Sequence, residues 1–69
     1  MTRNPVRSTQ LKSVGYDPET SKLEIQFNSG AVYEYSDVPE NTYKALVESP
    51  SIGTYFTDNI KWSFIYRKL

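Results

Sequence analysis

Apolar and polar residues alternate without a break in the segment KLEIQF, residues 22–27. This period of two is typical of a β-strand that turns one face toward a core. The turn residues NSG follow, and AVYEYS, residues 31–36, resumes the alternation. Upstream, TQLKSVGYD (9–17) is rich in strand formers and runs into DPET, which suits a type I turn. The pattern predicts an antiparallel meander of three strands.

The length of the NSG loop decides where the tyrosines of the hairpin point. A three-residue loop with Gly30 in the left-handed conformation places Ile25 opposite Tyr33, with Tyr35 on the same apolar face. A two-residue loop would place Glu34 across from Ile25, and burial of an unpaired carboxylate is costly. We therefore expect both tyrosines to face the core and Glu34 to face water.

After the segment DVP the period changes to between three and four, as in an amphipathic helix. Pro39 suits the first helical turn, where its missing N–H has no partner to lose, and Glu40 adds an acid at the positive end of the helix dipole. Pro50 disfavours a helical residue before it, so the helix should end near residue 49. Its apolar side is expected to consist of Tyr43, Leu46 and Val47.

A second, weaker helical pattern follows the first. Ser51 is a suitable N-cap, and apolar residues then recur at helical spacing, although Gly53 lowers the helix propensity. On this helix we expect Phe56 in the core and Tyr55 at its edge. The last segment, KWSFIYRKL (61–69), fits either a fourth strand or an extended tail.

The order of these elements predicts a small α+β domain. Three or four antiparallel strands would form a β-meander, with one or two short helices packed on one face of the sheet. A chain of 69 residues has the size of a single domain, and no repeat or linker divides it. We expect the domain to span residues 9–69 and residues 1–8 to be a disordered N-terminal arm.

The composition excludes several classes of function. The chain contains no cysteine and no histidine, which excludes disulfides, Cys/His zinc sites and histidine-based catalysis. The sequence holds neither a long apolar run nor a signal peptide, which predicts a cytoplasmic protein without a membrane span. No catalytic motif pairs its acidic residues, and Asp17 is explained by its turn. We therefore expect no enzyme activity, no metal and no cofactor.

Charge is distributed unevenly although the formal net charge is zero. Residues 1–16 contain three basic residues and no acid, and residues 17–48 contain seven acids and two lysines. Residues 49–69 contain one acid and three basic residues. The two basic ends would form one basic patch if they meet in space, and otherwise they are solvated chain ends.

Several short motifs keep a characteristic order and spacing along the chain: VGYD (14–17), LEIQF (23–27), Gly30, YEY (33–35), VP (38–39), Tyr43, Leu46, SIGTYF (51–56) and Ile60. Together they resemble the pattern of the KTSC domain family over residues 9–67. That family is named for the C-terminal extension of some lysyl-tRNA synthetases. The resemblance implies a standalone bacterial form of this domain, for which RNA binding is the usual suggestion.

Nine positions are expected to serve the fold and the motif. Gly15 suits a β-bulge or a close backbone contact, and the others shape turns, helix entry or core. Trp62 is expected in the core or at its rim, with base stacking as the alternative because Lys61 and Arg67 are close to it in the sequence. The nine positions are Gly15, Tyr16, Asp17, Gly30, Tyr33, Tyr35, Pro39, Gly53 and Phe56.

Two hypotheses of function follow. The first is a module that binds RNA, either tRNA or a single strand, by stacking bases on exposed aromatic rings and contacting phosphates with basic residues. The second is a module that docks onto another protein or onto itself, without binding nucleic acid. The candidate nucleic-acid contacts are Arg7, Tyr16, Tyr55, Lys61, Tyr66, Arg67 and Lys68.

Overall fold

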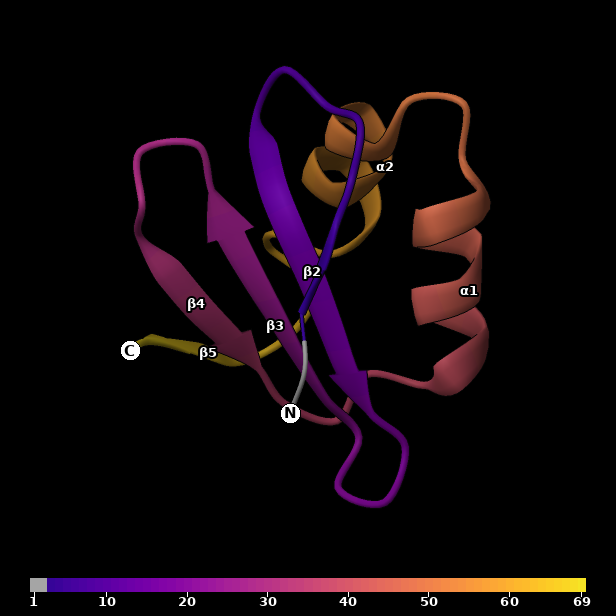
Figure 1. Cartoon of the computed structure of the whole chain (residues 1–69). Helices are drawn as coiled ribbons and strands as arrows, with labels where there is room; N and C mark the ends of the chain where they lie inside the picture. The colour runs from indigo at the N-terminus through magenta and orange to yellow at the C-terminus, as the bar shows by residue number, and fades with distance from the viewer. Residues whose placement is uncertain (1–2) are drawn as a thin grey trace.

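The computed structural model describes residues 3–69, which form a five-stranded antiparallel sheet and two helices (Figure 1). The predicted α+β class is confirmed, with five strands where three or four were expected. The strands lie side by side in chain order, so the sheet is a simple meander. The elements are β1 (Asn4–Pro5), β2 (Leu11–Asp17), β3 (Lys22–Phe27), β4 (Val32–Tyr35), α1 (Glu40–Glu48), α2 (Ile52–Asn59) and β5 (Tyr66–Lys68).

The β3–β4 hairpin has the register expected from its loop. Ile25 pairs with Tyr33 and Leu23 pairs with Tyr35, so both tyrosines lie on the apolar face of the sheet. Gly30 has a φ of 98°, the left-handed conformation that a residue with a side chain rarely adopts. The loop closes because the Gly30 N–H donates to the Phe27 carbonyl at 2.9 Å.

Strand β2 carries a bulge, but not at Gly15. The register against β3 shifts between Leu11 and Ser13, which leaves Lys12 as the extra residue. Leu11 and Val14 are three positions apart, so only an inserted residue lets both face the core, where they are 0% and 1% exposed. Gly15 is a buried member of the regular ladder beyond the bulge.

Both helices pack against the same face of the sheet and enclose the core. Leu46 of α1 and Phe56 of α2 are buried, as is Val38 just before α1. Val47 was predicted on the packed side of α1, but its side chain lies at the exposed edge with 36% of its surface accessible. The buried apolar residues are Leu11, Val14, Leu23, Ile25, Tyr35, Val38, Leu46, Phe56 and Ile60.

The N-terminal segment contributes to the sheet. Asn4 pairs with Val14, and the Val6 N–H donates to the Lys12 carbonyl at 3.2 Å. Within the segment expected to be a disordered arm, residues 4–5 form β1, and residues 1 and 2 lie outside the described residues. A two-residue strand that contains a proline has no periodicity of its own to reveal it.

The C-terminal segment ends as a strand. After α2 the chain continues in turns, with the Lys61 N–H donating to the Phe56 carbonyl at 2.9 Å. It then crosses behind the sheet and reaches the outer edge of β4, where Tyr66 pairs with Tyr35 (Figure 1). Of the two alternatives for residues 61–69, the strand is confirmed, although only its last part is extended.

Candidate ligand-binding groove

A groove of about 340 Å³ lies between the end of the β3–β4 hairpin and the segment after α2. We call it the aromatic groove. Phe27, Ser29 and Ala31 contribute from the hairpin end, and Tyr33, Tyr35 and Tyr66 contribute from the face of the sheet. Lys61 and Trp62 complete its wall.

Five of the eight described residues that line this groove are aromatic. The Tyr66 ring lies 5.5 Å from the Tyr33 ring and 5.3 Å from the Tyr35 ring, centroid to centroid. Tyr33 and Phe27 pack in a T-shaped arrangement with ring centroids 5.5 Å apart. Trp62 is 73% exposed, and the Lys61 ammonium lies 5.1 Å from the centre of its ring. The groove therefore presents π-faces together with a cation.

Tyr35 differs from the other groove tyrosines because it is almost entirely buried, with 2% of its surface exposed. Burial, followed by the nearness of Tyr66 and Tyr33, raises the pKa of Tyr35 to about 12. Its hydroxyl forms no hydrogen bond with any group in residues 3–69. Among the same residues no buried side-chain nitrogen or oxygen is without a partner. The hydroxyl must therefore reach solvent, and the groove that Tyr35 lines supplies that opening.

The raised pKa predicts a loss of stability in alkali. Because the folded-state pKa of Tyr35 lies above its ordinary value of 10.0, its neutral phenol contributes stability in full below pH 10. That contribution is lost as the pH rises through about 12. Urea unfolding between pH 9 and 12 should show a steeper decline for the native chain than for Tyr35→Phe. Equal slopes would contradict this expectation.

The structure brings some of the sequence-predicted RNA contacts to the groove. Lys61 and Tyr66 line it, and Lys68 lies on the same face of the sheet because it pairs with Tyr33 across β4 and β5. Arg67 lies on the opposite face, where its Nε donates to Glu34 Oε1 at 3.0 Å. Alternation along a strand therefore separates two basic neighbours in sequence.

The remaining candidates lie elsewhere. Tyr16 stacks on Tyr43 with ring centroids 4.8 Å apart, and its hydroxyl donates to the Val38 carbonyl at 2.6 Å. Tyr16 therefore connects its strand both to α1 and to Val38 just before that helix. Tyr55 packs against the core from α2 and is partly buried. Arg7 is exposed beside a different depression, at the start of α2.

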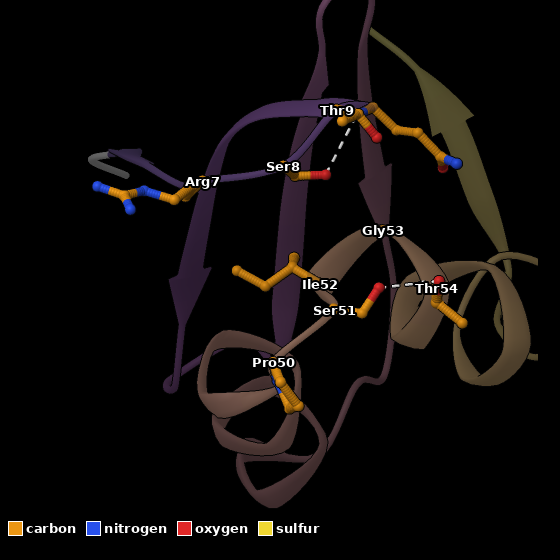
Figure 2. A pocket seen from close by; sticks show the side chains of 9 residues that line it. Arg7, Ser8, Thr9, Pro50, Ser51, Ile52, Gly53 and Thr54 are labelled. Carbon is orange, nitrogen blue, oxygen red and sulfur yellow. Dashed lines mark hydrogen bonds between the residues drawn. The ribbon is translucent and has the colours of Figure 1, made fainter.

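That second depression, of about 390 Å³, is framed by the loop before β2 and the first turn of α2 (Figure 2). Ser8 Oγ accepts hydrogen bonds from the N–H groups of Gln10 and Leu11, which holds the loop in place. A Cβ added to Gly53 would lie 3.1 Å from Ser8 Oγ, so glycine permits this close approach. Figure 2 shows the Arg7 side chain extending away from the start of the helix. The close packing of the loop on α2 therefore gives a structural reason for glycine at position 53.

The open face of the sheet carries paired charges. Arg3 donates to Glu24 at 2.9 Å, and Arg67 donates to Glu34. Glu24 and Glu34 are directly opposite each other on β3 and β4, so the two arginines from the chain ends offset a like-charge contact. A third depression of about 410 Å³ lies beside Arg3 and Glu24. The Arg3–Glu24 ion pair occupies one side of it, and its described lining contains no aromatic ring, which makes it a poorer site for stacking than the aromatic groove.

Trp62 is the groove residue that the sequence analysis misplaced. It was expected in the core or at its rim, yet it is largely exposed because the turns after α2 carry it away from the sheet. The signal in the sequence that could have predicted an exposed ring is the adjacent pair of Lys61 and Trp62 directly after an amphipathic helix. Within residues 3–69 there is no cluster of three acidic residues that could hold a metal ion, and no helix is long and apolar enough to cross a membrane.

Comparison with known proteins gives a consistent result. A family model described as the KTSC domain matches residues 7–64. The crystal structure of a KTSC domain protein from Yersinia pestis is 40% identical, with a TM-score of 0.96 over 99% of this chain and 96% of that chain. An uncharacterized protein of Stutzerimonas stutzeri (strain A1501) is 44% identical over 61 residues, covering 88% of this chain and 86% of that protein. A lysine–tRNA ligase of Nostoc sp. (strain PCC 7120) is 41% identical over 59 residues, which are 86% of this chain but 10% of the ligase.

Proposed function

The chain belongs to the KTSC domain family, and from this premise we propose that it is a non-catalytic module that binds RNA in the aromatic groove. In this proposal Trp62, Tyr66 and Tyr33 stack on unpaired bases. Lys61 and Lys68 contact the phosphates next to those bases. The other face of the sheet, with its matched charges, serves the fold.

The composition of the groove carries this proposal. Its described lining contains five aromatic rings and Lys61, and it contains no carboxylate that would repel a phosphate. Stacking on an exposed ring contributes roughly 1–3 kcal/mol per base and tolerates any base. The relation to a segment of a lysine–tRNA ligase adds support, since that ligase is named for a reaction on an RNA.

A fluorescence titration tests the proposal, because Trp62 is the only tryptophan of the chain. We expect a single-stranded RNA to quench Trp62 emission at micromolar concentrations in about 50 mM salt. Contact with two lysines predicts that log K falls with log salt at a slope of about −1.4, from roughly −0.7 per phosphate contact on a single strand. An unchanged emission at high RNA concentration would overturn the proposal.

A docking function is the second candidate, and exposed apolar side chains near the C-terminus favour it. Ile65 is 79% exposed and Leu69 is 55% exposed, and β5 is an edge strand of the sheet. If this surface binds a second copy, the mass measured by light scattering will rise with protein concentration. RNA will then leave Trp62 emission unchanged.

A further inference from the structure

The size of the aromatic groove limits what it can hold. At about 340 Å³ it lies at the small end of ligand pockets, which span roughly 300–1,000 Å³. A space of this size suits one or two rings and is too small for a folded RNA element. Bases within a duplex have their faces covered by neighbours, so the groove is open only to an unpaired base.

The polar groups of the groove point to a ligand that is flat and also forms hydrogen bonds. The Tyr35 hydroxyl belongs to a side chain that is 98% buried, and it has no partner within the described residues. A phenol that lines an aromatic groove can donate and accept a hydrogen bond, as the edges of nucleobases do. An apolar side chain of a protein partner would leave this hydroxyl unpaired.

The cations match the same ligand. Lys61 lines the groove, and Lys68 lies next to Tyr33 on the same face of the sheet. A nucleotide within a chain has one phosphate on each side of its base. Two lysines beside one aromatic groove can therefore contact both flanking phosphates.

From these three features we infer that the aromatic groove takes a single unpaired nucleobase of an RNA chain, with its ring against Trp62 and Tyr66 and its polar edge against the Tyr35 hydroxyl. This inference rests on the proposed function and narrows it from RNA in general to one extruded base. Every base offers both a ring face and a polar edge, so the groove accepts all four.

Three hexamers with identical phosphates test the inference. The first is intact single-stranded RNA, the second has one base and five abasic positions, and the third is wholly abasic. We expect the one-base hexamer to bind at least about fivefold more tightly than the wholly abasic one, because one stacked base contributes roughly 1–3 kcal/mol. The intact hexamer should exceed the one-base hexamer by no more than about sixfold, which is the statistical gain from six equivalent bases.

The outcomes distinguish a failure of the single-base inference from a failure of RNA binding itself. If the intact hexamer binds but the one-base hexamer is no better than the wholly abasic one, the groove needs several bases and the inference fails alone. If all three bind equally, recognition is by phosphate only, and the inference fails together with the base stacking of the proposed function. If the intact hexamer does not bind, the proposed function fails and the inference fails with it.

The Tyr35→Phe variant tests the polar edge without removing the ring. We expect it to weaken binding of the one-base hexamer by about 2- to 12-fold, the effect of one net hydrogen bond, and to leave the wholly abasic hexamer unaffected. Tyr16→Phe is the matched control, because the Tyr16 hydroxyl binds Val38 away from the groove. Equal affinity of Tyr35→Phe and the native chain for the one-base hexamer would exclude Tyr35 as a contact. Thermal unfolding of both variants checks that they are folded.

Discussion

Replacing Phe56 with alanine is expected to lower the free energy of unfolding by about 3–5 kcal/mol. Phe56 is 1% exposed and packs in T-shaped arrangements against Phe27 and Tyr35, with ring centroids 5.6 Å apart in each pair. Its removal leaves a cavity where α2 meets the sheet. Domains of this size have stabilities of only about 3–10 kcal/mol, so the variant should be largely unfolded or close to it. Urea unfolding followed by circular dichroism measures the change.

The neighbouring residue provides the control for this substitution. Tyr55 lies on the same helix but is only partly buried, so Tyr55→Ala should cost clearly less. Phe56→Leu keeps an apolar side chain and should lie between the two. A loss of less than about 1 kcal/mol for Phe56→Ala would mean that α2 does not depend on this contact.

Replacing Trp62 with alanine is expected to weaken RNA binding by about 5- to 150-fold, the range for the loss of one stacking ring. The fold should be unaffected, because the side chain is 73% exposed and belongs to no strand or helix. The substitution also removes the fluorescent reporter, so binding is measured by the anisotropy of a fluorescein-labelled RNA. Thermal unfolding verifies that stability is retained.

Two further variants test whether the loss of affinity is specific to an aromatic ring in the groove. Trp62→Phe keeps a ring at the same position and should restore most of the affinity. Arg67→Gln removes a charge from the opposite face of the sheet and should change the affinity by less than about threefold, although Arg67 was a candidate contact from the sequence. An affinity that is unchanged in Trp62→Ala, or lost in Arg67→Gln, would move the binding surface away from the aromatic groove.

The meander, the hairpin register and both helices could be predicted because local interactions specify them. Alternation over KLEIQF and the glycine at position 30 determine which side of the sheet Tyr33 and Tyr35 occupy. Pro39 and Pro50 flank the first helix, which indeed spans Glu40–Glu48. Ser51 occupies the N-cap position of the second helix, although its hydroxyl donates to Thr54 and forms no capping hydrogen bond with the backbone. Gly53 lowers helix propensity but is retained in α2 because it packs closely on Ser8.

The edge strands and the bulge could not be predicted from local pattern. β1 and β5 have two and three residues, so no period is visible, and each exists only through its pairing with a longer strand. The bulge at Lys12 is needed only because Leu11 and Val14 must face the same core. Gly15 was expected to form a bulge or a close backbone contact, and the bulge lies instead at Lys12. Glycine is common at bulges, but the packing of the core determines where the bulge forms.

The sequence by itself determined the fold class, the family and the apolar face of the hairpin, since these depend on neighbours along the chain. The tertiary structure decided which basic and aromatic residues share a surface. Tyr33 and Lys68 are 35 positions apart yet pair directly, while Arg67 and Lys68 are adjacent yet lie on opposite faces. The physical reason is that strand pairing brings distant residues together, and the pleat of a strand separates adjacent ones.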